Sequence, residues 1–178
     1  MDDLGGSCSH ADLRKRLDFS DADLVAECKV HRHRASGPGG QHRNKVASAI
    51  RLHHYPSGIV VNAAESRLQG ENKTRALRRL RSAIALAARV PLPASIVWPE
   101  SVAVVKKRLK VNDKNPGVHH VIALVLDSLA EHQGRLADAA GALGVTSSSL
   151  TKFLRDHPKA WREAARIRDE AGLPPLRT

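Results

Sequence analysis

The stretch Arg34-Ala35-Ser36-Gly37-Pro38-Gly39-Gly40-Gln41-His42-Arg43-Asn44-Lys45 is a glycine-rich loop sequence with basic residues at both ends. Gly39 and Gly40 lack side chains, so their backbone can adopt positive φ angles and approach another surface closely. Around them lie donors suited to phosphate and ribose oxygens, namely Arg34, Ser36, His42, Arg43, Asn44 and Lys45. The pattern favours a loop that contacts RNA, and a plain flexible turn is the alternative.

Strand-like runs lie on both sides of this loop. Residues 28–34 alternate as a strand does and lead into it. Residues 49–55 and 58–64 form two further runs, and Pro56-Ser57-Gly58 between them is typical of a tight turn. The loop therefore connects one strand to a β-hairpin.

Helical patterns flank these strands. Ser20 and Asp23 form a capping-box pattern that predicts a short helix. From about residue 69 to 89 apolar residues recur at helical spacing, which predicts one long amphipathic helix on the sheet. Its apolar stripe consists of Leu77, Leu80, Ile84 and Ala87. Its basic residues are Lys73, Arg75, Arg78, Arg79 and Arg81.

The second half of the chain is expected to be helical. Residues 91–116 are predicted to be a connector with one short helix that begins at Pro99. Beyond it, one apolar stripe is formed by Val118, Ile122, Val125 and Leu129, and further helices are expected at 135–143, 146–155 and 158–170. The fold class is therefore α+β, with residues 1–90 as a mixed domain and 117–178 as an all-α domain.

Charge indicates the kind of partner. The chain has 29 Lys and Arg against 18 Asp and Glu, a net charge of +11, and such a surface attracts polyanions. No apolar run approaches the roughly 20 residues that span a bilayer, so nucleic acid is favoured over membrane. The amino terminus has no signal- or transit-peptide pattern. Two cysteines are too few for a disulfide scaffold, which favours a reduced, cytoplasmic setting.

The loop resembles the signature of the class I peptide chain release factors, R-x-S-G-x-G-G-Q-x-x-N-K, from Arg34 to Lys45. The resemblance continues through residues 48–52 and 56–61. It then includes the family's acidic, arginine, glutamine and asparagine pattern at Glu65, Arg67, Gln69 and Asn72. It covers residues 19 to 90 without a large gap, so it is far more specific than a lone glycine-rich tripeptide.

The resemblance implies a catalytic role for Gly39-Gly40-Gln41 in the large ribosomal subunit. There the Gln41 backbone N–H is expected to stabilise the oxyanion during hydrolysis of peptidyl-tRNA, and its side-chain amide to admit water. It implies no cofactor, and it makes Gln41 a target for N5-methylation by a glutamine methyltransferase. RNA contacts are also expected outside the loop, at Arg67, Gln69, Asn72, Lys73 and Arg78.

We expect residues 1–90 to be this hydrolase domain. No stop-codon-reading domain is expected, because only a short segment precedes the resembling region. The chain is therefore expected to be a monomer that rescues stalled ribosomes without reading a codon.

Residues 136–154 resemble a helix-turn-helix of the Fis type, with Gly144 at the turn and Thr146 as the cap of the second helix. Lys152 on that helix is expected to contact RNA. An ordinary helical hairpin without a ligand is the alternative.

Other functions stay open at this point. One alternative is a non-catalytic ribosome- or RNA-binding factor, and another is a DNA-binding regulator. A zinc site at Cys8, His10, Cys28 and His31 is disfavoured because the spacings match no compact finger. Asp127, Glu131 and Asp138 are expected on helix surfaces, where they form no paired-carboxylate site.

Overall fold

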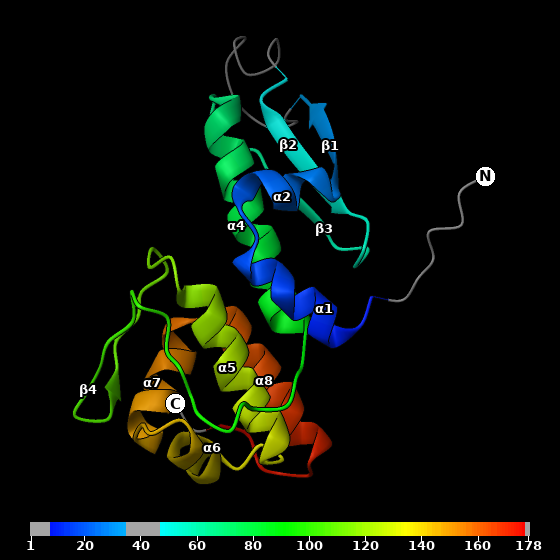
Figure 1. Ribbon diagram of the computed structural model, residues 1–178. Coiled ribbons are helices and arrows are strands. Elements are labelled where there is room, and N and C mark those ends of the chain that lie inside the picture. The colour runs from blue at the N-terminus through cyan, green and yellow to red at the C-terminus, as the bar shows by residue number, and fades with distance from the viewer. Residues whose placement is uncertain (1–7, 35–46, 177–178) are drawn as a thin grey trace. The chain divides into compact units, whose positions relative to one another are not determined.

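The computed structural model describes residues 8–34 and 47–176. The chain forms two compact units, Met1–Ile84 and Ala85–Thr178 (Figure 1). Helices and antiparallel strands make up the first unit, and the second is mostly helical, so the predicted α+β class is confirmed. The predicted division into a hydrolase domain, a connector and an RNA-binding domain concerns function and stays a prediction.

The first unit is built on an antiparallel sheet with the strand order β1-β2-β3. Its elements are α1 (His10–Lys15), the 3-10 helix η1 (Arg16–Asp18), α2 (Asp21–Ala26), β1 (Cys28–His33), β2 (Ala49–His54), β3 (Val60–Ala63) and α4 (Gln69–Ala87). Ser20 caps α2 by accepting from the Asp23 backbone N–H, so the predicted helix start is confirmed; the Asp23 carboxylate accepts from the Ser20 hydroxyl at 2.7 Å. The β2–β3 hairpin is also confirmed, and Gly58 in its turn has a φ of 66°.

The core of this unit lies between β2 and α4. Ile50 and Leu52 of β2 are buried while Arg51 between them is exposed, as expected for a strand with one covered face. Leu80 and Ile84 of α4 are fully buried and supply the other side of this core.

One predicted member of the α4 stripe is wrong. Ala87 is exposed, and Ala88 is buried in its place because it lies four residues after Ile84. The helix ends at Ala87, two residues before its predicted end at Arg89. The Arg89 guanidinium donates to the carbonyl oxygens of Ala85, Leu86 and Ala88, which satisfies groups that a helix end leaves open.

The second unit begins with extended chain, and the predicted helix at Pro99 is wrong. Val102 N–H donates to the Pro99 carbonyl oxygen at 2.8 Å, which closes a single turn. The chain then forms a small hairpin of β4 (Val104–Val105) and β5 (Arg108–Leu109). The β-branched valines that precede the turn favour extended backbone over helix.

Four helices complete the second unit, as the sequence predicts: α5 (Val118–Glu131), α6 (Leu136–Ala142), α7 (Ser147–Asp156) and α8 (Pro158–Glu170). The predicted stripe of α5 is buried at Val118, Ile122, Val125 and Leu129. Leu150 and Leu154 of α7 are also buried, and Gly144, with a φ of 68°, forms the turn between α6 and α7. None of the helices in residues 8–34 and 47–176 is long and apolar enough to cross a membrane.

The predicted surface position of Asp127 is wrong. This residue is 2% exposed, and its Oδ1 accepts from the Val90 backbone N–H at 3.2 Å and from Arg89 Nη1 at 3.4 Å. Burial lowers the pKa of Arg89 to about 10, although the negative charge of Glu163 has the opposite, smaller effect. Asp127 lies on α5 between the buried stripe positions, where its carboxylate fixes the extended chain that follows α4.

Candidate functional site

The structure describes both ends of the segment that carries Gly39-Gly40-Gln41. β1 and β2 pair in antiparallel register with His33 opposite Ala49, so the chain leaves and re-enters the sheet at one end. The side chain of Arg34 is exposed at this end. The tripeptide itself lies outside the described residues, as do Ser36, His42, Arg43, Asn44 and Lys45.

Asn72 holds the returning end of this segment. Its Nδ2 donates to the carbonyl oxygens of Ser48 at 2.8 Å and Ser66 at 2.7 Å. Its Oδ1 accepts from the Ser66 backbone N–H at 3.0 Å. The residue is 0% exposed, so both amide donors and the oxygen are used inside the protein. The structure therefore does not support the predicted RNA contact of Asn72 and gives it a positioning role.

The remaining predicted RNA-binding residues of this unit lie at the surface. Arg67, Lys73 and Arg78 are exposed, and Gln69 at the start of α4 is half-buried. Among the described residues, no carboxylate is within ion-pair distance of these three cations. Their charges are open to a polyanion, and their assignment as RNA contacts stays a prediction.

Two other basic residues of α4 hold the first unit together. Arg79 Nη2 lies 2.6 Å from Glu65 Oε1, its Nη1 donates to the Asn62 carbonyl oxygen, and the hydrogen bond from Arg79 lowers the pKa of Glu65. Arg81 Nη1 lies 2.6 Å from Asp21 Oδ1, and its Nη2 donates to the Phe19 carbonyl oxygen at 2.7 Å. The basic face of α4 is thus divided between structural and open positions.

A cluster of buried His54 with half-buried Glu27 and Arg16 supports the β2–β3 turn. His54 is 0% exposed. Its Nε2 lies 2.9 Å from Glu27 Oε2, and its Nδ1 lies 2.6 Å from Ser57 Oγ. Arg16 binds the same carboxylate with Nε at 2.6 Å and Nη2 at 2.9 Å. In the neutral ring Nε2–H donates to the Glu27 carboxylate, and Nδ1 accepts from the Ser57 hydroxyl.

Burial and hydrogen bonds have opposite effects on the pKa values of His54 and Glu27. Burial lowers the pKa of His54, and the opposing effect of the Glu27 hydrogen bond is smaller. Burial raises the pKa of Glu27, but the hydrogen bonds from Arg16 and His54 outweigh it and the net pKa is lowered. The partners Glu27 and Arg16 give no sequence signal, because both are distant from His54 along the chain.

The structure does not bring together the residues of the disfavoured zinc site. Among the described residues, no group of three or more His, Cys, Asp or Glu side chains has the arrangement to hold a metal ion. Cys28 Sγ instead donates to the Leu24 carbonyl oxygen at 3.1 Å, and burial raises the pKa of its thiol to about 11.

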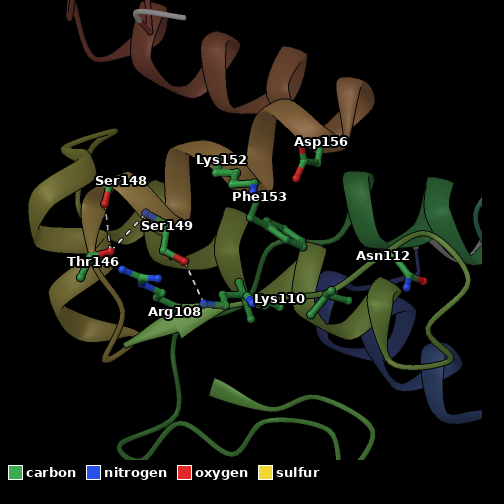
Figure 2. A pocket seen from close by; sticks show the side chains of 11 residues that line it. Arg108, Lys110, Asn112, Thr146, Ser148, Ser149, Lys152, Phe153 and Asp156 are labelled. Atoms are coloured by element: carbon green, nitrogen blue, oxygen red, sulfur yellow. Dashed lines mark hydrogen bonds between the residues drawn. The ribbon is translucent and has the colours of Figure 1, made fainter. Parts of the chain in front are cut away.

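In the second unit, Lys152 lies on α7 at the wall of a pocket (Figure 2). The other wall comes from β5 and the residues after it, with Arg108 and Lys110. These two cations are not among the residues predicted from the sequence, although the basic run Lys106-Lys107-Arg108-Leu109-Lys110 is a sequence signal for them.

Comparison with known proteins finds similarities in the first half of the chain. Residues 22–93 match the RF-1 domain family. A 66-residue segment is 53% identical to peptide chain release factor 2 of Acidithiobacillus ferrooxidans and covers 37% of this chain and 17% of that protein. A 70-residue segment is 46% identical to peptide chain release factor 1 of Lacticaseibacillus casei and covers 38% of this chain and 20% of that protein.

The similarity to these relatives is confined to one domain. The chain spans only 17% and 20% of the length of the two relatives. Residues 22–93 contain β1, β2, β3 and α4 together with the glycine-rich segment. This segment of the chain is therefore similar to the RF-1 domain and to parts of peptide chain release factors 1 and 2.

Proposed function

We propose that this protein hydrolyses the ester bond of peptidyl-tRNA on the ribosome, with Gly39, Gly40 and Gln41 as the catalytic residues. The observation that carries the proposal is the match of residues 22–93 to the RF-1 domain, since this segment includes the tripeptide. Proteins named peptide chain release factors 1 and 2 share it at 46% and 53% identity.

The reaction is an acyl transfer to water. The water oxygen bonds to the ester carbonyl carbon, the bond from that carbon to the tRNA ribose oxygen breaks, and the ribose oxygen takes up a proton. The Gln41 backbone N–H donates to the oxygen that becomes negative, and one such donor contributes about 3 kcal/mol to the transition state. The Gln41 amide orients the water, and the absence of side chains at Gly39 and Gly40 permits close approach.

The described residues supply the frame for this chemistry. The antiparallel pair His33 and Ala49 fixes where the segment leaves and returns, and Asn72 fixes Ser48 next to that pair. We propose that the exposed cations Arg34, Arg67, Lys73 and Arg78 contact RNA phosphates around the site. Fixed positioning of the reacting groups contributes to the rate beyond what the single donor supplies.

We further propose that the protein acts on stalled ribosomes without reading a codon. This proposal is supported by the separate unit that follows the RF-1 domain, which is mostly helical and has a basic pocket suited to a polyanion.

A peptide-release assay tests both parts. Release of labelled peptide is measured from ribosomes stalled on an mRNA without a stop codon, on a stop codon, and from split large subunits. Gln41→Ala and Gly40→Ala are each expected to slow release by about a hundredfold or more at saturating protein. Gly70→Ala, a glycine of α4 with nothing within 4 Å of an added Cβ, is the matched control and should keep the wild-type rate.

The outcomes separate the alternatives. Release only on the stop codon contradicts codon independence but retains the hydrolase. Ribosome binding by wild-type protein without release on any complex identifies a non-catalytic ribosome-binding factor. Tighter binding to duplex DNA than to ribosomes at equal salt identifies a DNA-binding regulator, and the salt must match because both interactions depend on it steeply.

A further inference from the structure

The second unit contains a pocket of about 540 Å³ between the β4–β5 hairpin and α7. Basic and hydroxyl side chains line it: Arg108, Lys110, Thr146, Ser148, Ser149 and Lys152. Figure 2 shows Arg108 and Lys110 on the strand side and Ser148, Ser149 and Lys152 on the side of α7. A cavity of this kind offers both positive charge and neutral hydrogen-bonding groups to one ligand.

The positive charge around the pocket is not neutralised within the unit. Lys106, Lys107, Arg108, Lys110 and Lys152 are exposed, and no carboxylate of the described chain lies within ion-pair distance of them. Asp156 is the acidic residue that lines the pocket, and nearby Asp113 is paired with His157 Nε2 at 3.3 Å. The local balance is therefore strongly basic, and an extended polyanion is the partner that fits it.

The turn of the hairpin places lysines where the backbone disfavours them. Lys106 and Lys107 have φ angles of 49° and 59° and form the two-residue connection between the paired residues Val105 and Arg108. Such a turn prefers Asn-Gly, because positive φ crowds the Cβ of other residues. An Asn-Gly pair would relieve this backbone strain. The two lysines are present in spite of the strain, which points to a function for their side chains.

The hairpin is fixed to α7, so the two walls form one site. The Thr146 backbone N–H donates to the Lys107 carbonyl oxygen at 3.0 Å. The Leu109 backbone N–H donates to Ser149 Oγ at 2.8 Å. These hydrogen bonds connect the cationic turn directly to the start of the helix and keep the cations at a set spacing from the hydroxyl groups.

The hydroxyl groups distinguish between ligands. Thr146 Oγ1 and Ser148 Oγ lie 3.1 Å apart and both residues are exposed. Lysine and arginine only donate, so they suit phosphate oxygens, whereas a hydroxyl can also accept from a ribose 2′-OH. The 2′-OH is the group that separates RNA from DNA at a protein surface.

We propose that this pocket and the adjoining turn of the β4–β5 hairpin together bind the sugar-phosphate backbone of an RNA strand. Arg108, Lys110 and Lys152 of the pocket and Lys106 and Lys107 of the turn contact phosphates, and Thr146 and Ser148 contact a 2′-OH. The identification of the ligand as RNA rests on the proposed ribosomal function. The proposal places the RNA contact of this unit on the hairpin and one face of α7 together, where the sequence predicts a contact by the second helix alone.

The test uses the full-length protein and a fluorescently labelled RNA hairpin with a single-stranded tail. Lys106→Asn combined with Lys107→Gly removes two charges and restores the preferred turn sequence, so the fold should be retained. Lys159→Gln combined with Arg162→Gln removes two charges from exposed positions on α8 outside the pocket and is the matched control. Affinity is measured against salt for the RNA and for DNA of the same sequence.

The turn variant is expected to bind the RNA on the order of tenfold more weakly at low salt, and its slope of log affinity against log salt should fall by about one to two. The α8 variant should change both quantities much less. Equal losses in the two variants, or equal affinity of wild-type protein for RNA and DNA, overturn the proposal.

Peptide release at saturating protein separates this proposal from the proposed function. The turn variant is expected to keep the wild-type maximal rate and to need a higher concentration to reach it. If wild-type protein releases no peptide but the RNA result holds, the hydrolase assignment fails and the pocket stands. If release is normal at every concentration and RNA binding is unchanged, the pocket assignment fails alone.

Discussion

Asn72 Nδ2 lies 2.8 Å from the carbonyl oxygen of Ser48, so a buried amide of α4 holds the residue that directly precedes β2. The same amide also binds the backbone of Ser66: Asn72 Oδ1 accepts from the Ser66 N–H, and Asn72 Nδ2 donates to the Ser66 carbonyl oxygen. One side chain therefore links the helix, the chain that enters the helix and the returning end of the glycine-rich segment. Asn72 therefore acts together with the His33–Ala49 pair to fix where the chain re-enters the sheet.

Asn72→Ala is expected to lower the free energy of unfolding by about 2–4 kcal/mol, because it leaves buried backbone groups of Ser48 and Ser66 without partners. Peptide release should fall with it, since the return point of the segment is no longer fixed. Urea unfolding and the release assay give the two quantities.

Lys73→Ala is the matched control for Asn72→Ala, because Lys73 is the exposed neighbour on the same helix. It should change the unfolding free energy by less than about 0.5 kcal/mol. If Asn72→Ala unfolds like the wild type and yet weakens RNA binding, the positioning role is wrong and a direct RNA contact is right.

Acid is expected to destabilise the first unit through His54 and Glu27. The pKa of His54 is lowered by burial, so the unfolded chain binds more protons than the folded one below the ordinary value of 6.5. The contribution of His54 to the free energy of unfolding is therefore fully present above that pH. It falls as the pH drops towards the pKa of His54 in the folded protein. The lowered pKa of Glu27 adds a second loss that begins below its ordinary value of 4.5.

His54→Gln and His53→Gln form a matched pair for this prediction. Unfolding free energies of wild type and both variants are measured between pH 7.5 and 5. The wild type and His53→Gln should lose stability below pH 6.5, while His54→Gln should start lower and depend less on pH. A pH dependence that persists unchanged in His54→Gln shows that another group titrates.

The sequence predicts most of this fold because the patterns are local. The helix start at Ser20, the turn at Gly58 and the buried stripe of α5 each depend on neighbours within a few residues, and each is found in the structure. The hairpin after Pro99 was not predicted, because Lys106-Lys107 is an unfavourable turn sequence that carries no turn signal.

The candidate site is less predictable because its contacts join distant parts of the chain. Asn72 is found by the family pattern, but its partner Ser48 lies in another element, so the sequence cannot separate a buried amide from an RNA contact. Asp127 has the same difficulty, since a carboxylate on an apolar helix is normally placed at the surface. Its partner, the Val90 backbone N–H, is distant in sequence and meets Asp127 only in the folded chain.

Gly58→Ala and Gly70→Ala should change stability in opposite directions. Gly58 has a φ of 66° and Gly70 has no such φ, while neither has an atom within 4 Å of an added Cβ. Backbone strain is therefore the main effect at Gly58, where alanine should cost about 1 kcal/mol. Alanine at Gly70 should stabilise α4 by about 0.5 kcal/mol, and thermal unfolding measures both. A gain at Gly58 contradicts the turn geometry.

Arg78→Ala and Arg81→Ala remove the same charge from α4, but the first should weaken ribosome binding and the second should lower stability. Arg81 binds Asp21 and the Phe19 carbonyl oxygen, so its loss should lower the unfolding free energy by about 1 kcal/mol. Arg78 is exposed and has no ion-pair partner in the described part of the chain, so its loss should leave unfolding within about 0.5 kcal/mol. Arg78→Ala should instead reduce the salt slope of ribosome binding by about one, as expected for one lost phosphate contact. Because the two variants have the same net charge, equal effects on ribosome binding would mean that α4 attracts RNA through its overall charge, and the assignment of Arg78 to a phosphate would then be wrong.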